Sequence, residues 1–252
     1  MIDRGMLITQ AAMLRKRLRE DGDSPVDVFS LALNIEGLSL VYYPLGNKLS
    51  GMCIKSKSGN ITIAVNSLMS QGRQRFSLSH EFYHLFYDDN MISVCAKKID
   101  SGKDIEKAAD MFASYFLMPE TSLLLMAERL SENNDDGYLS LADVVSIEQY
   151  YKVSHQATVY RLMHTPYLDE AKGKKYLNTP VRKYAGTLGF STELYDCSAE
   201  DSRYKTYGNY IELAGQVYDS GMISAGKYDE LLLDAFRADL VYGEEEEDVL
   251  LD

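Results

Sequence analysis

The segment FSLSHEFYHLFYD, residues 76–88, constrains the fold most strongly, because it places two of the four histidines of the chain four residues apart. In an α-helix, residues four apart lie on one face, one turn from each other. Three phenylalanines in the same segment give it an apolar side that belongs in a core. The pattern predicts a buried helix whose His80 and His84 side chains point at a common location.

Two imidazoles one helical turn apart can bind a single zinc ion. Glu81 lies about 100° around the helix from His80, so it borders such an ion without having to bind it. A carboxylate at that position can act as the general base toward metal-activated water. The alternative is that His80 and His84 are packed or solvated helix residues, and the spacing alone does not exclude it.

A catalytic zinc site needs a third protein ligand and one position left for water. No histidine follows His84 at short spacing, and the next predicted helix, DIEKAADMFASYFLMP, offers Glu106. Asp110 lies one turn after Glu106, where it can hold the free N–H of a ligating histidine. A solvated helix face would explain each carboxylate separately. It would not explain the apolar run at 109–116, which predicts burial, so we expect Glu106 to be the third ligand.

Composition predicts a cytoplasmic globular protein with no membrane partner. Hydrophobic residues make up 46% and charged residues 25% of the chain, and no apolar run is long enough to span a bilayer. The N-terminal segment carries charges throughout and lacks the apolar centre of a signal peptide. Cys53, Cys95 and Cys197 lie far apart without a CxxC pair, as in proteins of reducing compartments. We expect all three to be buried or incidental thiols.

The net charge of −12 repels a phosphate backbone and speaks against direct DNA binding. A helix-turn-helix-like segment near 141–163 raises that possibility, but its second helix carries Arg161 as its one arginine or lysine. This reading is therefore disfavoured.

The pattern of short apolar runs predicts an α+β fold. A small twisted β-sheet packs on the HExxH helix, and a mainly α-helical C-terminal region follows. A polar break at 131–137 separates a predicted metallopeptidase domain, 1–130, from this region, 138–252, which ends in an acidic tail at 244–252. The expected strands are 38–44, 51–57 and 61–66, the last two forming a hairpin, and the first expected helices are 7–20 and 26–37, with Asp23 or Ser24 as the N-cap of the second.

The segments RQRFSLSHEFYHLFYD and EKAADMFASYFLMP resemble the ImmA/IrrE family of zinc metallopeptidases. The family pattern is RxxF[ST]xAHExxH followed by ExxA[ND]xFAxxxLMP. The chain departs from it at Ser79, where alanine is usual, and both residues are small. The likeness covers residues 10–165 well and the remainder loosely. The matching positions are Arg73, Phe76, Ser77, His80, Glu81, His84, Glu106, Ala109, Asp110, Phe112, Ala113, Met118 and Pro119, then Ser154, Ala157, Arg161 and Leu162.

This resemblance implies a thermolysin-like (zincin-like) core with Zn²⁺ on His80, His84 and Glu106, and Glu81 as the base. Members are typically intracellular and are often encoded on mobile elements or in stress-response loci. They act on one regulatory protein, commonly a helix-turn-helix repressor, and so relieve repression; the expected partner here is such a regulator encoded nearby. Some stand beside toxin–antitoxin modules. The implied function is therefore a zinc-dependent endopeptidase with a specific intracellular protein substrate.

A tetrahedral oxyanion needs a hydrogen-bond donor, and the sequence does not rank the candidates Tyr83, Tyr87, His155, Arg161 and His164. A sheet edge, with 61–66 as the candidate, would align an extended substrate by strand addition.

The rival reading is a metal-containing regulatory or toxin–antitoxin-associated protein that acts by binding a partner without cleavage. A structural zinc has four protein ligands and needs no base, so the intact Glu81 favours catalysis.

Overall fold

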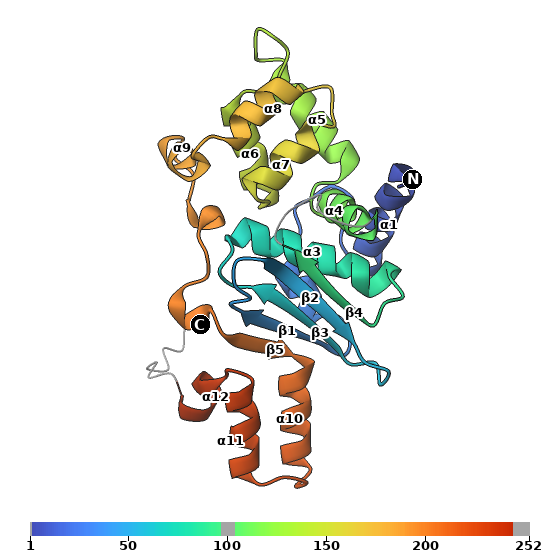
Figure 1. The fold of residues 1–252 in the computed structure, drawn as a ribbon, viewed down its shortest axis with the longest axis vertical. Helices are drawn as coiled ribbons and strands as arrows, with labels where there is room; N and C mark the ends of the chain where they lie inside the picture. The colour runs from blue at the N-terminus through green and yellow to red at the C-terminus, as the bar shows by residue number, and fades with distance from the viewer. Residues whose placement is uncertain (1, 97–103, 244–252) are drawn as a thin grey trace.

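The computed structural model describes residues 2–96 and 104–243, which form an α+β fold around one mixed β-sheet (Figure 1). The strands are β1 (Leu38–Tyr43), β2 (Leu49–Lys55), β3 (Ile61–Asn66), β4 (Ile92–Ala96) and β5 (Lys205–Gly208). Their order across the sheet is β4-β2-β3-β1-β5. β1 and β3 run parallel, and the other neighbours are antiparallel. The two edges of the sheet are therefore β4 and β5.

Three of the strands were expected from the sequence, and the β2–β3 hairpin is confirmed. The expectation that 61–66 forms a sheet edge is wrong, because β3 pairs with β2 on one side and with β1 on the other. Its last four residues are buried, as is usual for an interior strand. The edge strands β4 and β5 fall in stretches where no strand was predicted.

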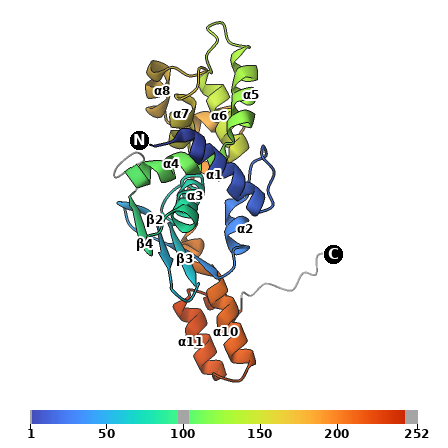
Figure 2. The ribbon, with the colours of Figure 1, turned by 90° about the vertical axis from the view of Figure 1, so that its right-hand side faces the viewer.

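Four helices build the layer over one face of the sheet. They are α1 (Arg4–Arg17), α2 (Val28–Leu33), α3 (Gln71–Tyr87) and α4 (Asp104–Leu117). α3 lies against the sheet, and α1 and α4 pack above it (Figures 1 and 2). The N-cap of α2 is Asp27, which accepts a hydrogen bond from the Phe29 N–H, so the expected caps Asp23 and Ser24 are wrong. Asp21 instead binds the backbone N–H groups of Asp23 and Ser24.

Aromatic side chains join α3 to α4. The ring of Phe82 meets that of Phe116 edge-on at 5.9 Å between centroids, and Phe112 stacks on Phe116 at the same separation. All three are fully buried. Burial of each such side chain contributes roughly 1.5–3 kcal/mol, so this contact fixes the face of α3 that carries the histidines against α4.

The second half of the chain supplies a helical cluster beyond α4 and a helical hairpin beyond the opposite side of the sheet (Figure 1). The cluster consists of α5 (Glu120–Ser131), α6 (Leu141–Tyr151), α7 (His155–Leu162), α8 (Glu170–Leu177) and α9 (Val181–Thr187). Two short 3₁₀ turns, Glu193–Tyr195 and Glu200–Ser202, lead back to β5. The chain then forms α10 (Asn209–Asp219), α11 (Ala225–Asp234) and α12 (Ala238–Tyr242).

The predicted pair of helices near 141–163 is confirmed as α6 and α7, joined at Lys152, which has a left-handed φ of 56°. The predicted division into 1–130 and 138–252 stays a prediction; the later part contributes β5 to the common sheet. The acidic tail, 244–252, lies outside the described residues. Within 2–96 and 104–243, no helix has both the length and the apolar content to cross a bilayer.

Candidate metal centre

His80 and His84 lie on the buried face of α3, one turn apart, as their spacing predicts. Both side chains are almost completely buried. Their Nε2 atoms are 3.2 Å apart and so point at a common location. Two helix residues therefore offer two imidazole nitrogens to one small site.

Glu106 reaches the same site from the first turn of α4. Its Oε2 lies 3.4 Å from Nε2 of His80, and its Oε1 lies 3.5 Å from Nε2 of His84. Ligands held about 2.0–2.1 Å from a zinc ion at tetrahedral angles are separated by about 3.4 Å. Each imidazole nitrogen thus lies at about that spacing from one oxygen of the Glu106 carboxylate, and the donor set fits zinc.

Carboxylates hold both imidazoles from behind. Nδ1 of His80 is 2.9 Å from Oδ1 of Asp110, and Nδ1 of His84 is 2.8 Å from Oδ2 of Asp88. A proton on each Nδ1 leaves the Nε2 lone pair facing the site, which is the tautomer a metal ligand needs. Asp110 was expected in this role and Asp88 was not. Its position, four residues after His84 at the C-cap of α3, was the available signal.

Lys55 on β2 fixes the end of α3 that carries His84. Its Nζ donates to the carbonyl oxygen of His84 at 3.0 Å and also to that of Asp88. A cation at a helix C-terminus binds carbonyl groups that lack helical partners and favours the negative end of the helix dipole. The histidine and its carboxylate are thereby attached to the sheet.

The surrounding carboxylates favour positive charge at the site. Burial opposes the charged form of His80, but hydrogen bonds to Asp110 and Glu106 outweigh it and raise the pKa of His80 to about 9. The hydrogen bond to His80 lowers the pKa of Glu106, which keeps that side chain an anion. A site that stabilises an imidazolium between carboxylates also suits a divalent cation.

Glu81 points from α3 toward the sheet and is fully buried. Its Oε2 accepts a hydrogen bond from Ser93 of β4 at 3.1 Å, and its Oε1 lies where a side chain on Gly51 of β2 would be, 2.8 Å from an ideal Cβ. Burial raises the pKa of the Glu81 carboxyl, although the nearby His80 opposes that shift. A raised pKa brings a carboxylate closer to the range in which it exchanges protons at neutral pH.

Cys95 of β4 is a further group at the site and departs from the expectation of an incidental thiol. Its Sγ, one nitrogen of each histidine and one oxygen of Glu106 lie within 4.8 Å of one another. Like the histidines, Cys95 is buried, at 1% exposure. The expected three-donor site is therefore accompanied by a thiol from the edge strand of the sheet.

A cavity of about 490 Å³ opens beside the metal centre, between α4 and α7. Asp110 lines it, together with two of the predicted oxyanion donors, Arg161 and His164. The Arg161 guanidinium lies 4.4 Å from the ring centroid of Tyr115 and pairs with Glu120. The cavity is therefore the hollow through which a ligand could approach Asp110.

The other three candidate donors do not line this cavity. Tyr83 packs edge-on to the neighbouring His84, with 6.0 Å between ring centroids. The Tyr87 hydroxyl donates to the carbonyl oxygen of Gln10 at 2.9 Å. His155 has both ring nitrogens in hydrogen bonds, to Glu148 at 2.7 Å and to the Tyr176 carbonyl at 3.0 Å. The identity of the oxyanion donor stays a prediction.

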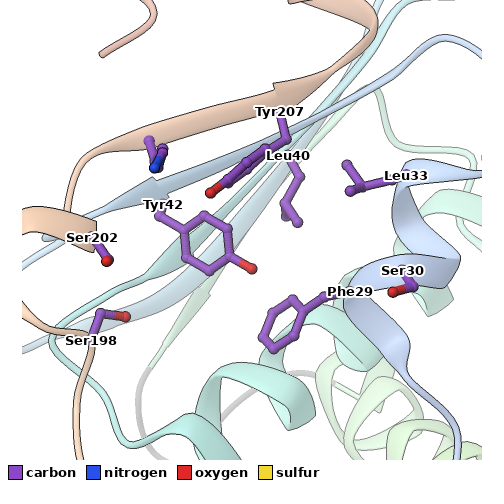
Figure 3. Close-up of a pocket in the computed structure, with 9 residues that line it drawn as sticks. Phe29, Ser30, Leu33, Leu40, Tyr42, Ser198, Ser202 and Tyr207 are labelled. Carbon is purple, nitrogen blue, oxygen red and sulfur yellow. The ribbon is translucent and has the colours of Figure 1, made fainter. Parts of the chain in front are cut away.

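A second hollow, of about 220 Å³, lies between α2 and the β1–β5 side of the sheet (Figure 3). Tyr42 stands between Phe29 and Tyr207, with ring centroids 5.7 and 6.0 Å apart respectively. Its described lining contains no histidine, cysteine or carboxylate. It therefore offers none of the donors that the metal centre has.

Comparison with known proteins gives a family match over the segment that contains the residues of the metal centre. The family model for the IrrE N-terminal-like domain, Peptidase_M78, matches residues 24–163, more than half of the chain. No curated protein matches significantly. Among solved structures, a Mycobacterium tuberculosis transcriptional regulator is similar at 13% identity and a TM-score of 0.42, with 64% of this chain and 48% of that chain covered. The chain spans about half the length of that regulator, and the likeness is too low to support a conclusion.

Proposed function

Because the chain belongs to the Peptidase_M78 family of IrrE N-terminal-like domains, we propose that it is a zinc-dependent endopeptidase with a zincin-like core. The matched residues include α3 and α4, which supply all the histidine and carboxylate donors of the site. We further propose that it acts inside the cell on one specific regulatory protein.

One observation carries the proposal: the donors of His80, His84 and Glu106 converge at separations of 3.2, 3.4 and 3.5 Å. Packed or solvated helix residues have no reason to bring two imidazole nitrogens and a carboxylate within 3.5 Å of one another. Asp88 and Asp110 strengthen this reading, because they turn both imidazoles inward.

Glu81 is the proton carrier in this proposal. Bound zinc supplies Lewis-acid activation of water and of the scissile carbonyl. Glu81 borders the donors from the sheet side, where it can accept a proton from the attacking water and pass it to the leaving amine. Ser93 and the bare backbone of Gly51 hold its carboxylate in that place.

The edge strand β4 is the surface we propose for substrate alignment. In the described part of the chain it pairs with β2 and has no strand on its other side. An extended peptide can add to such an edge through backbone hydrogen bonds. Cys95 of β4 lies beside the metal donors, so a peptide paired with β4 passes close to them.

The charge of the chain supports a basic partner. A net charge of −12 attracts a positively charged protein and repels DNA itself. We propose a helix-turn-helix regulator encoded nearby, because a protein that binds DNA carries the basic surface that this acidic chain attracts. Cleavage of such a regulator relieves repression.

A second candidate function is association with a regulator without cleavage. The observation that favours it is Cys95, which would complete a set of four protein donors. Four protein ligands are typical of a structural zinc site, in which no position is left for water.

Co-expression with the neighbouring regulator distinguishes the two functions. The wild-type chain is expected to shorten the regulator on a gel. Glu81→Gln keeps the size of the side chain but cannot accept the proton, so the regulator should stay whole and remain bound. Glu170→Gln, the same substitution at an exposed glutamate of α8 outside the metal centre, is the control and should cleave like wild type.

Two results would contradict this account, the first the cleavage itself and the second the role of Glu81. If the regulator stays intact with wild type while its target genes still respond, association is the function. If Glu81→Gln and wild type cleave at equal rates, Glu81 is not the base.

A further inference from the structure

Cys95 occupies a defined place in the sheet next to the metal donors. It pairs with Gly51 of β2 in the β2–β4 register, and Ser93, two residues earlier on β4, faces the same side. Ser93 donates to Glu81, and the vacant side of Gly51 holds the other oxygen of that carboxylate. The thiol therefore lies on the α3 side of β4, near both the general base and the metal ligands.

The distances from the Cys95 sulfur to the other donors are close to the distances between two ligands of one zinc ion. Zinc bonds of about 2.3 Å to sulfur and about 2.0–2.1 Å to nitrogen put the two atoms about 3.6 Å apart in a tetrahedral site. Cys95 Sγ lies within 4.8 Å of the histidine and glutamate donors. An approach of about 1 Å on metal binding would bring the sulfur to ligand distance.

We propose that Cys95 is the fourth ligand of the resting metal centre, so that its sulfur occupies the position required by the attacking water and holds the peptidase latent. The inference rests on the proposed peptidase function and adds a mode of regulation to it. On metal binding, the S–H bond breaks, the metal–sulfur bond forms, and the adjacent Glu81 receives the proton and releases it to solvent. Binding of the protein substrate along β4 would open the site: the Cys95 sulfur would leave the metal, regain a proton through Glu81, and free the position for water.

The chain contains its own controls for this assignment. Cys53 on β2 is as deeply buried as Cys95, and Cys197 is exposed, but neither is part of the donor cluster. Cys53→Ala therefore matches Cys95→Ala in burial and in the loss of a thiol. It removes no donor from the site.

Cobalt substitution gives a readout that does not depend on activity. A cobalt–thiolate bond produces an intense near-ultraviolet charge-transfer band, whereas nitrogen and oxygen ligands give only weak visible bands. The cobalt-loaded wild type and Cys53→Ala should show the charge-transfer band. Cys95→Ala should lose it and keep the visible bands of cobalt bound by the remaining donors.

Zinc competition with a chelator supplies the second measurement. Loss of an outer carboxylate weakens zinc binding roughly 10–100-fold, and loss of a direct thiolate ligand should exceed that range. Cys53→Ala should bind zinc like wild type. Circular dichroism of each variant establishes that the fold is retained.

The outcomes separate this inference from the proposed function. Cobalt bound to wild type without a charge-transfer band overturns Cys95 as a ligand and leaves the peptidase proposal standing. A band that persists in Cys95→Ala also overturns it. A wild-type chain that binds no cobalt or zinc overturns both. If Cys95→Ala cleaves the regulator more slowly than wild type, the cysteine is not inhibitory.

Discussion

Asp88 tests whether carboxylates behind the imidazoles hold the metal ligands in place. Its Oδ2 lies 2.8 Å from Nδ1 of His84, and its other oxygen accepts hydrogen bonds from the backbone and side chain of Asn90. Although burial opposes the shift, the hydrogen bonds from Asn90 and His84 lower the pKa of Asp88, so the group is an anion at neutral pH. Asp88→Ala removes the acceptor that fixes the tautomer of His84.

The expected loss of zinc affinity on this substitution is roughly 10–100-fold, or about 1.4–2.8 kcal/mol. Asp88→Asn keeps an oxygen acceptor without the charge and should lose less. Zinc dissociation constants are measured by chelator competition at neutral pH, with Asp89→Ala, the exposed neighbour, as the control. Unchanged affinity in Asp88→Ala, or an equal loss in Asp89→Ala, would refute the idea that this hydrogen bond supports the metal.

Three further outcomes follow from the same geometry. Asp110→Ala should also weaken zinc binding roughly 10–100-fold without unfolding the chain, and unchanged chelator competition would contradict this. Gly51→Ala places a methyl group 2.8 Å from the Glu81 carboxylate, so the cleavage rate should fall roughly 100-fold while the zinc content stays unchanged. A wild-type cleavage rate in this variant would show that the carboxylate can accommodate the methyl group. Burial disfavours the charged form of His155, but the hydrogen bond to Glu148 outweighs burial and raises the pKa of His155. Protonated His155 therefore stabilises the folded state fully below its unfolded pKa of about 6.5, and this stabilisation is lost as the pH rises through its folded pKa. The difference in free energy of unfolding between wild type and His155→Gln, from urea titrations, should therefore shrink from pH 5.5 to alkaline pH, and a difference that grows would contradict it.

The helix pair that carries the site could be predicted from the sequence because its information is local. Helical spacing alone places His80 and His84 on one face, and the apolar run of the next helix indicates that Glu106 belongs to a buried helix. The structure brings these three donors together. Aromatic packing between α3 and α4 fixes the contact of the two helices.

The edge strands and the thiol could not be predicted from local pattern. β4 is five residues long and follows a polar turn, and β5 is four residues long and pairs with a strand more than 160 residues away. Such pairing depends on distant partners and leaves a weak local pattern. Because β4 was not predicted, the sequence could not place Cys95 next to the histidines. Gly51 was a usable signal, because glycine inside a strand often marks a close approach of another group.

The zinc content of the purified protein tests the metal centre most directly, because both the peptidase and the thiol ligand depend on it. Elemental analysis should find about one zinc per chain in wild type and in His164→Ala, whose histidine lies outside the donor set. His84→Ala, which removes one of the two converging imidazoles, should lose most of the metal. Full zinc occupancy in His84→Ala, or none in wild type, would contradict the assignment of His80, His84 and Glu106 as the metal ligands.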